Sequence, residues 1–162
     1  MKSNLSLYGA ISWAILCIVA AFDPLSAAAQ TSCDGSDNNP PEISAIYLDN
    51  FSGWHAVGKE AWVSVLADGQ LIFSLCSVDN NKKYLIARNS DSNDFNPGKF
   101  SRFEWFGSNG QLFYCQQVFD AASAADAANF TATPAADTSD PNDKGCGAGG
   151  QFAWSQLALL RR

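Results

Sequence analysis

The chain contains a single histidine, His55, which follows Trp54, and this limits the catalytic chemistry available to it. A Ser-His-Asp or Cys-His site needs a base that titrates near neutral pH, so such a site would have to use His55. No GxSxG motif marks a nucleophile, and the cysteines are better explained as disulfides. We therefore interpret His55 as a structural residue and predict no catalytic residues.

Paired carboxylates could hydrolyse a glycosidic bond without histidine. The chain has only three glutamates, Glu42, Glu60 and Glu104, and most of its aspartates lie in turn-like segments. Turn aspartates normally accept hydrogen bonds from nearby backbone groups. A small hydrolase is therefore our third functional hypothesis, not our first.

Two polar segments, DGSDNN (34–39) and NSDSND (89–94), cluster side-chain oxygens that could bind calcium. An EF-hand loop would place glycine at its sixth position and glutamate at its twelfth. Counted from Asn89, those positions hold Asp94 and Phe100, and the count from the first segment fails in the same way. We interpret both segments as solvated turns, with a looser calcium site as the alternative, and predict no metal and no cofactor.

The stretch FSRFEWF (100–106) combines opposite charges with aromatic residues. Strand alternation places Phe100, Arg102, Glu104 and Phe106 on one face and the residues between them on the other. If the charged face were exposed, the ion pair would contribute under about 1 kcal/mol. If it faced an interior cavity, it would be a polar anchor in an aromatic pocket, as in many small-ligand sites.

Six large aromatic residues could stack on sugars or line a cavity: Trp54, Trp62, Tyr84, Trp105, Tyr114 and Trp154. A domain of this size also needs large side chains to fill its core, so most of the six should be buried. We take the predicted ligand-binding residues to be Arg102, Glu104, Phe100, Phe106 and Trp54.

The rest of the sequence indicates the elements that would hold these residues. Seven segments rich in aromatic and β-branched residues are expected to be strands: 43–50, 54–57, 61–66, 71–78, 83–89, 99–106 and 111–119. Turn compositions such as Asp68-Gly69 and Asn109-Gly110 separate them. Because the connections are too short for helical crossovers, we predict an all-β antiparallel up-and-down meander that forms a small barrel or a two-layer sandwich.

After Phe119 the composition becomes rich in alanine. Asp120 is expected to cap one short C-terminal helix that runs to about Asn129. Residues 131–150 hold prolines, aspartates and glycines and are predicted to form a surface loop. The segment 151–160 then supplies a last strand.

The N-terminus has the three-part plan of a secretory signal peptide. Lys2 precedes an apolar run from Ala10 to Phe22, and Ala27-x-Ala29 offers a cleavage site. We predict a signal peptide over 1–29, an extended polar lead over 30–42 and a single β-domain over 43–162, in a secreted or periplasmic protein. The apolar run is shorter than the ~20 residues that a membrane span needs, so no stable span is expected after cleavage.

The formal net charge is −6. Phosphate binding depends on clustered lysine and arginine, so nucleic acid is excluded as an expected partner.

Four cysteines follow the signal peptide: Cys33, Cys76, Cys115 and Cys146. An even number in an exported chain indicates two disulfides. A four-thiolate zinc site usually needs close pairs such as CxxC, whereas these cysteines are at least 31 residues apart. The spacing leaves all three possible pairings open.

The order IARN…NPGKFSRFEW…LFYCQ…DAA…AAD…DP…GCG…W, from about Ile43 to Leu157, resembles a group of small exported bacterial β-rich proteins with no known activity. The positions of Cys115 and Cys146 are cysteine in that group, whereas Cys33 and Cys76 are additions here. The resemblance therefore implies that Cys115 pairs with Cys146, which leaves Cys33 to pair with Cys76.

These observations favour an exported non-catalytic binding module for a small apolar or carbohydrate ligand. A structural or interaction protein of the cell exterior, without a small ligand, is the alternative. An open cavity would favour the first hypothesis and a filled interior the second.

Overall fold

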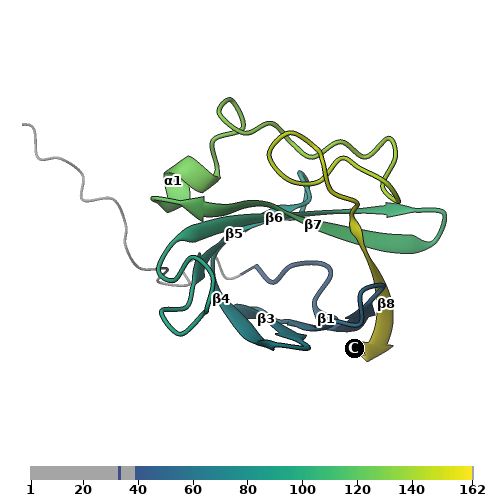
Figure 1. The fold of residues 1–162 in the computed structure, drawn as a ribbon, viewed down its shortest axis with the longest axis horizontal. Coiled ribbons are helices and arrows are strands. Elements are labelled where there is room, and N and C mark those ends of the chain that lie inside the picture. Colours follow the sequence, from purple (N-terminus) through teal and green to yellow (C-terminus); the bar gives the residue numbers. More distant parts are fainter. Residues whose placement is uncertain (1–32, 34–38, 162) are drawn as a thin grey trace, which may run out of the picture.

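The computed structural model describes residue 33 and residues 39–161 (Figure 1). Eight strands form a closed antiparallel barrel in which each strand pairs with the next along the chain. Their bounds are β1 (Ala45–Asp49), β2 (Trp54–Val57), β3 (Ala61–Leu66), β4 (Gly69–Asp79), β5 (Tyr84–Asn89), β6 (Phe100–Ser108), β7 (Gln111–Ala121) and β8 (Ser155–Arg161).

The barrel closes because β8 pairs with β1 as well as with β7. Leu48 lies opposite Ala158 in the first ladder, and Leu112 lies opposite Leu157 in the second. The predicted all-β antiparallel meander is confirmed, and of its two forms the chain adopts the barrel. β2 and β3 have the predicted bounds, whereas β8 begins at Ser155, after the predicted start at Gln151.

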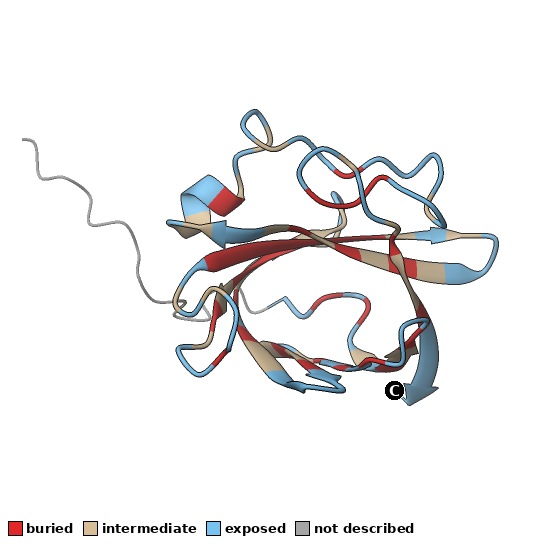
Figure 2. Ribbon diagram, viewed as in Figure 1, coloured by how far each residue is buried: buried red, intermediate tan, exposed pale blue. Residues whose placement is uncertain are grey.

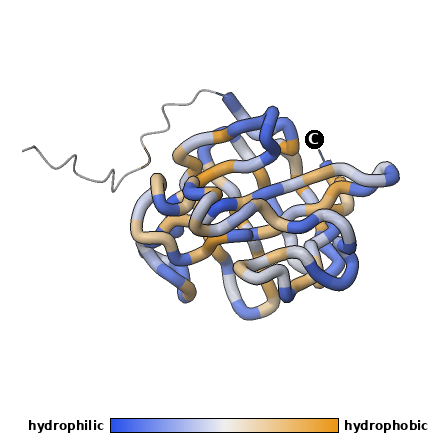
Figure 3. The backbone as a smooth tube through the Cα atoms, turned by 90° about the horizontal axis from the view of Figure 1, so that it is seen from above, coloured by the Kyte–Doolittle hydropathy of each residue, from blue (hydrophilic) through white to orange (hydrophobic). Residues whose placement is uncertain are grey.

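The barrel interior is filled by apolar side chains from all eight strands and from the segment before β1. Buried and less buried residues alternate along β2, β3 and β7, as expected for strands with one face in a core (Figure 2). Figure 3 shows that apolar and polar residues are interspersed along the backbone of the barrel. The central cluster comprises Ile43, Tyr47, Val57, Trp62, Phe73, Leu75, Leu85, Ala87, Phe103, Trp105 and Leu157.

The β6–β7 connection shows how local sequence sets the register. Asn109 and Gly110 form a two-residue loop with φ values of 51° and 75°. Both lie in the left-handed region that a type I′ hairpin requires, which asparagine and glycine adopt most readily. The tight turn places Ser108 opposite Gln111 and so pairs Phe106 with Phe113.

β6 has the longest run of buried residues of the eight strands, because both of its faces are buried from Phe100 to Trp105 (Figure 2). The inner face packs in the barrel. The outer face is covered by residues 122–154, which connect β7 to β8 and which we call the strap. In Figure 1 the strap lies across β6 and β7.

The helix in the strap, α1 (Ala124–Ala127), is shorter than predicted, and Asp120 is not its cap. β7 continues to Ala121, which pairs with Phe100, so the backbone at Asp120 is extended within the sheet. Ser123 caps the helix instead: its side chain accepts a hydrogen bond from the Asp126 backbone N–H at 3.1 Å.

Two disulfides are present, Cys33–Cys76 and Cys115–Cys146, in the pairing that the resemblance implies. The first ties the segment before β1 to β4, and the second ties the strap to β7. The predicted signal peptide and most of the polar lead lie outside the described residues. Within residues 33 and 39–161, no helix has the length and apolarity needed to span a membrane.

Candidate functional site

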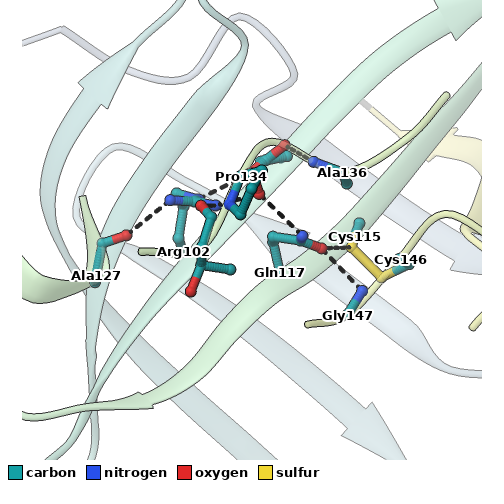
Figure 4. Close-up of polar contacts among 10 residues, drawn as sticks. Arg102, Cys115, Gln117, Ala127, Pro134, Ala136, Cys146 and Gly147 are labelled. Carbon is teal, nitrogen blue, oxygen red and sulfur yellow. Dashed lines mark hydrogen bonds and ion pairs between the residues drawn. A yellow bond between two sulfur atoms is a disulfide. The ribbon is translucent and has the colours of Figure 1, made fainter. Parts of the chain in front are cut away.

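Arg102 lies on the outer face of β6, fully buried under the strap (Figure 4). Its Nε donates to Glu104 Oε1 at 2.8 Å. Its terminal nitrogens donate to three strap carbonyls, at distances of 2.7 to 3.1 Å: those of Ala127, Thr133 and Pro134. The guanidinium also lies 4.0 Å from the centre of the Phe130 ring. Every part of this side chain therefore contacts the protein itself.

Glu104 and Gln117 extend this network along the strap. Glu104 Oε2 accepts a hydrogen bond from the Ala136 N–H at 2.9 Å, so both carboxylate oxygens are used. Gln117 on β7 donates to the Pro134 carbonyl and accepts from the Gly147 N–H. These three polar side chains satisfy backbone groups that the strap would otherwise bury without partners. They attach the strap to the barrel.

The other predicted ligand-binding residues are not brought together at one site either. Phe100 is buried against Ile86 and Ala127 under α1. Phe106 packs on Phe113 and Trp154, with ring centres 5.1 Å and 4.8 Å away. Trp54 is 53% exposed on the outer face of β2 and does not join them. Four of the five predicted residues therefore contact the strap and hold it on the barrel: Arg102, Glu104, Phe100 and Phe106.

His55 lies in the barrel interior between two polar partners. Its Nε2 is 3.0 Å from Asp49 Oδ2, and its Nδ1 is 3.0 Å from Ser64 Oγ. The Trp62 indole Nε1–H also donates to Nδ1, at 3.2 Å. Because an indole nitrogen can only donate, Nδ1 must be an acceptor, and the proton of the neutral ring must be on Nε2.

The order Asp49–His55–Ser64 resembles a catalytic triad, but its setting supports a structural role. Ser64 is only 6% exposed, and a substrate would need the space that fully buried Trp62 fills. Asp49 meanwhile accepts hydrogen bonds from the Phe51 and Gly53 N–H groups and so holds the β1–β2 turn. Burial lowers the pKa of His55, although the Asp49 carboxylate opposes the shift. The network joins β1, β2 and β3 through a neutral imidazole.

A hollow of about 410 Å³ lies at one end of the barrel, where β4 begins and β5 and β7 end. Its volume is in the range of small-molecule sites, roughly 300–1,000 Å³. We call it the mouth pocket. It is lined by Leu71, Phe73, Asn89, Phe95, Asn96, Gln116, Phe119 and Phe152.

Three phenylalanines of this lining are exposed to solvent. Phe95 is 65% exposed, Phe152 is 55% and Phe119 is 39%. They come from the β5–β6 loop, the strap and the end of β7, which are far apart in the sequence. Isolated exposed phenylalanines are common, but three that converge on one concavity are unusual, which makes the mouth pocket the candidate site.

Each of the three phenylalanines belongs to a segment with a fixed backbone. The loop that carries Phe95 is held by buried Asn93, whose side chain accepts from the Ile72 N–H and donates to the Ile72 carbonyl. Asn89 Nδ2 donates to the carbonyl of Phe119 at 3.0 Å. These contacts fix the backbone around the mouth pocket by bonds within the protein itself, and such a preformed site would lower the entropic cost of binding.

Phe152 is held through the disulfide in the strap. It forms a two-residue antiparallel bridge with Cys146, with hydrogen bonds of 2.9 and 3.0 Å, and Cys146 is bonded to Cys115 on β7. A side chain at Gly147 would come within 2.7 Å of the Phe152 ring, so glycine is needed for this close approach.

No family model, curated protein or solved structure matches this chain. The resemblance to a group of exported bacterial proteins therefore stays a prediction, and the mouth pocket is assessed on its own geometry.

Other hollows have larger volumes but fewer aromatic residues in their linings. One of about 540 Å³ lies among strap residues 132–150 and is lined mainly by glycine, alanine and polar residues. Another of about 670 Å³ lies on the outside of β1, β2 and β3. Neither contains an aromatic side chain, whereas half of the mouth pocket lining is phenylalanine.

The sequence reasoning missed the residues of the mouth pocket. One signal was available: Phe95 stands in the polar turn segment NSDSNDFNPG, where a large apolar side chain has no core to enter. Phe119 and Phe152 carried no such signal, because each lies in or beside a strand-like segment.

Proposed function

We propose that this protein is an exported, non-catalytic binding module that takes a small, predominantly apolar ligand in the mouth pocket. The observation that carries the proposal is the convergence of Phe95, Phe119 and Phe152 on one hollow. Burying exposed aromatic surface on a ligand is favourable, at roughly 25 cal/mol per Å². Export is supported by the two disulfides, which persist mainly in oxidising compartments.

The second hypothesis, a structural protein without a small ligand, draws support from the filled barrel interior. Trp62 stacks on Phe103 with ring centres 4.8 Å apart, so the centre of the barrel holds no ligand-sized space between them. The mouth pocket lies at one end, beyond these rings. A ligand would therefore rest on the core and not replace it.

The proposal is tested with the neutral fluorescent compound N-phenyl-1-naphthylamine, whose emission rises in apolar surroundings. We expect saturable binding to the wild-type protein. The variant F95A/F119A should bind at least about tenfold more weakly, because it removes two rings that each contribute on the order of 1 kcal/mol or more of contact energy.

Two variants serve as controls. Phe51 is 65% exposed, as is Phe95, but lies in the β1–β2 turn outside the mouth pocket lining, so F51A should leave the affinity unchanged. W54A tests the one predicted ligand-binding aromatic that remains exposed. Equal affinity in wild type and F95A/F119A, or a larger loss in W54A, would refute the mouth pocket as the site.

A further inference from the structure

The mouth pocket contains two polar side chains whose orientation follows from a chain of hydrogen bonds. Asn89 Nδ2 donates to the carbonyls of Asn96 and Phe119, at 2.9 and 3.0 Å. Since carbonyls only accept, the amide nitrogen of Asn89 must face them. Asn89 Oδ1 therefore points the other way, toward Ser101 Oγ at 2.6 Å.

Ser101 passes this constraint on to Gln116. The single hydroxyl proton of Ser101 is donated to Asn89 Oδ1, so Ser101 Oγ can only accept from its other neighbour. That neighbour is Gln116 Nε2, at 2.9 Å. The amide of Gln116 is thus oriented with its nitrogen toward Ser101 and with Oε1 on the other side of the amide group.

Gln116 Oε1 is the free end of this chain. It accepts no hydrogen bond from residue 33 or residues 39–161, although Gln116 lines the mouth pocket. No buried side-chain nitrogen or oxygen in that part of the protein lacks a partner, so Oε1 is open to solvent. Both Nδ2 hydrogens of Asn89 and one Nε2 hydrogen of Gln116 are engaged by protein acceptors, so Gln116 offers a ligand its acceptor Oε1 and its second Nε2–H.

We propose that the ligand of the mouth pocket is an apolar molecule with a hydroxyl or N–H donor, which bonds to Gln116 Oε1. This inference rests on the proposed function and narrows the ligand class. Apolar compounds whose polar atoms only accept, such as ethers and carboxylates, can bond to the second Nε2–H of Gln116 but leave Oε1 without a donor, so they fit the mouth pocket less well than a compound with a hydroxyl or N–H group. A site built to bond a donor rejects the analogue that lacks it more strongly than a hydrophobic wall rejects a change in size.

The test compares two compounds with the same ring system, 2-naphthol and its methyl ether 2-methoxynaphthalene, by isothermal titration calorimetry. Wild type should bind 2-naphthol about fivefold more tightly than the ether, which corresponds to one net hydrogen bond. The variant Q116M keeps a similar volume but has no amide acceptor. It should bind both compounds with equal affinity, at the level that wild type shows for the ether.

The ether also reports whether the variant still has an intact mouth pocket. If Q116M failed to fold, ether binding would be lost with naphthol binding, and the milder variant S101A would replace it. S101A leaves Gln116 in place but frees its amide to turn, so the preference for 2-naphthol should fall while ether binding is kept.

The outcomes separate the two proposals. No binding of either compound to wild type, or binding of both that F95A/F119A leaves unchanged, would overturn the proposed function. Binding of both that depends on the phenylalanines, but with no preference for 2-naphthol or with the preference intact in Q116M, would overturn only the donor requirement.

Discussion

At the scale of single residues, Arg102 shows how a charged side chain can serve the fold. Removing this guanidinium leaves Glu104 Oε1 and the carbonyls of Ala127 and Thr133 without their donor, whereas the Pro134 carbonyl keeps its bond from Gln117. Breaking a buried ion pair by removing one partner typically costs about 3–5 kcal/mol. We expect R102M to lower the free energy of unfolding in urea by about that amount.

The matched control is R88M. Arg88 donates to Asp91 at 2.7 Å, but Asp91 is mostly exposed, so this pair should contribute less than about 1 kcal/mol. Folded R102M should bind N-phenyl-1-naphthylamine as wild type does, because Arg102 lies under the strap. If R102M is as stable as R88M, our structural assignment of Arg102 is wrong. If R102M also loses ligand affinity while its stability is kept, Arg102 is a ligand contact.

The residue scale also shows what the sequence could predict for the site. Alternation correctly placed Arg102 and Glu104 on the face opposite Phe103 and Trp105, because that depends only on strand geometry. Whether this face was open to water depended on the strap, which begins 18 positions after Glu104. From the sequence we expected Arg102 and Glu104 either to be exposed to solvent or to face an interior cavity. A third arrangement, in which the outer face of the strand is covered by another segment of the chain, was not considered.

At the scale of elements, the strands were predictable because their signals are local. Asn109-Gly110 specifies its turn from two residues, and β2 and β3 follow directly from their apolar alternation. The helix was overestimated because alanine content favours helix, whereas pairing with β6 keeps the chain extended as far as Ala121. The mouth pocket could not be predicted, since it exists only where β4, β5, β7 and the strap meet after closure.

The disulfide in the strap gives a prediction at this scale. C115A/C146A should lower the free energy of unfolding by about 3 to 4 kcal/mol, because it frees a loop of 31 residues. It should also weaken N-phenyl-1-naphthylamine binding, since the bridge that positions Phe152 starts from Cys146. Denaturation in urea and fluorescence titration measure the two effects separately.

C33A/C76A is the control for this prediction. Its disulfide closes a longer loop of 43 residues but contacts no residue of the mouth pocket lining that the structure describes. It should therefore destabilise the protein to a similar degree and leave the affinity of the folded protein unchanged. Loss of affinity in both double variants would mean that binding follows overall stability and not the position of Phe152.

At the scale of the whole molecule, the aromatic core that stabilises the barrel and the mouth pocket lie in different places. Trp62, Phe73 and Phe103 form a continuous aromatic core, with ring centres 4.8 and 4.9 Å apart. The strap stiffens one side of the barrel, and the hydrogen bonds of His55 join the strands on the other. The mouth pocket can then expose three phenylalanines because the rest of the apolar surface already stabilises the fold.

The stability of the whole barrel should depend on pH through His55, the only histidine in the chain. Burial lowers its pKa in the folded state below the ordinary value of 6.5, and two donors at Nδ1 further disfavour protonation there. The unfolded chain therefore binds more protons than the folded one as the pH falls below about 6.5. The contribution of the neutral His55 ring to the free energy of unfolding is complete above about pH 6.5 and is lost as the pH falls toward the folded-state pKa.

We expect the free energy of unfolding in urea to fall between pH 7.5 and pH 5, with a slope of at most about 1.4 kcal/mol per pH unit for one proton. The variant H55Q should be less stable at pH 7.5 and should lose the part of the pH dependence that comes from the imidazole. Subtracting the H55Q curve from that of wild type isolates the imidazole. A difference that grows as the pH falls would show that the folded barrel favours the charged imidazole through Asp49, and would overturn the neutral assignment of His55.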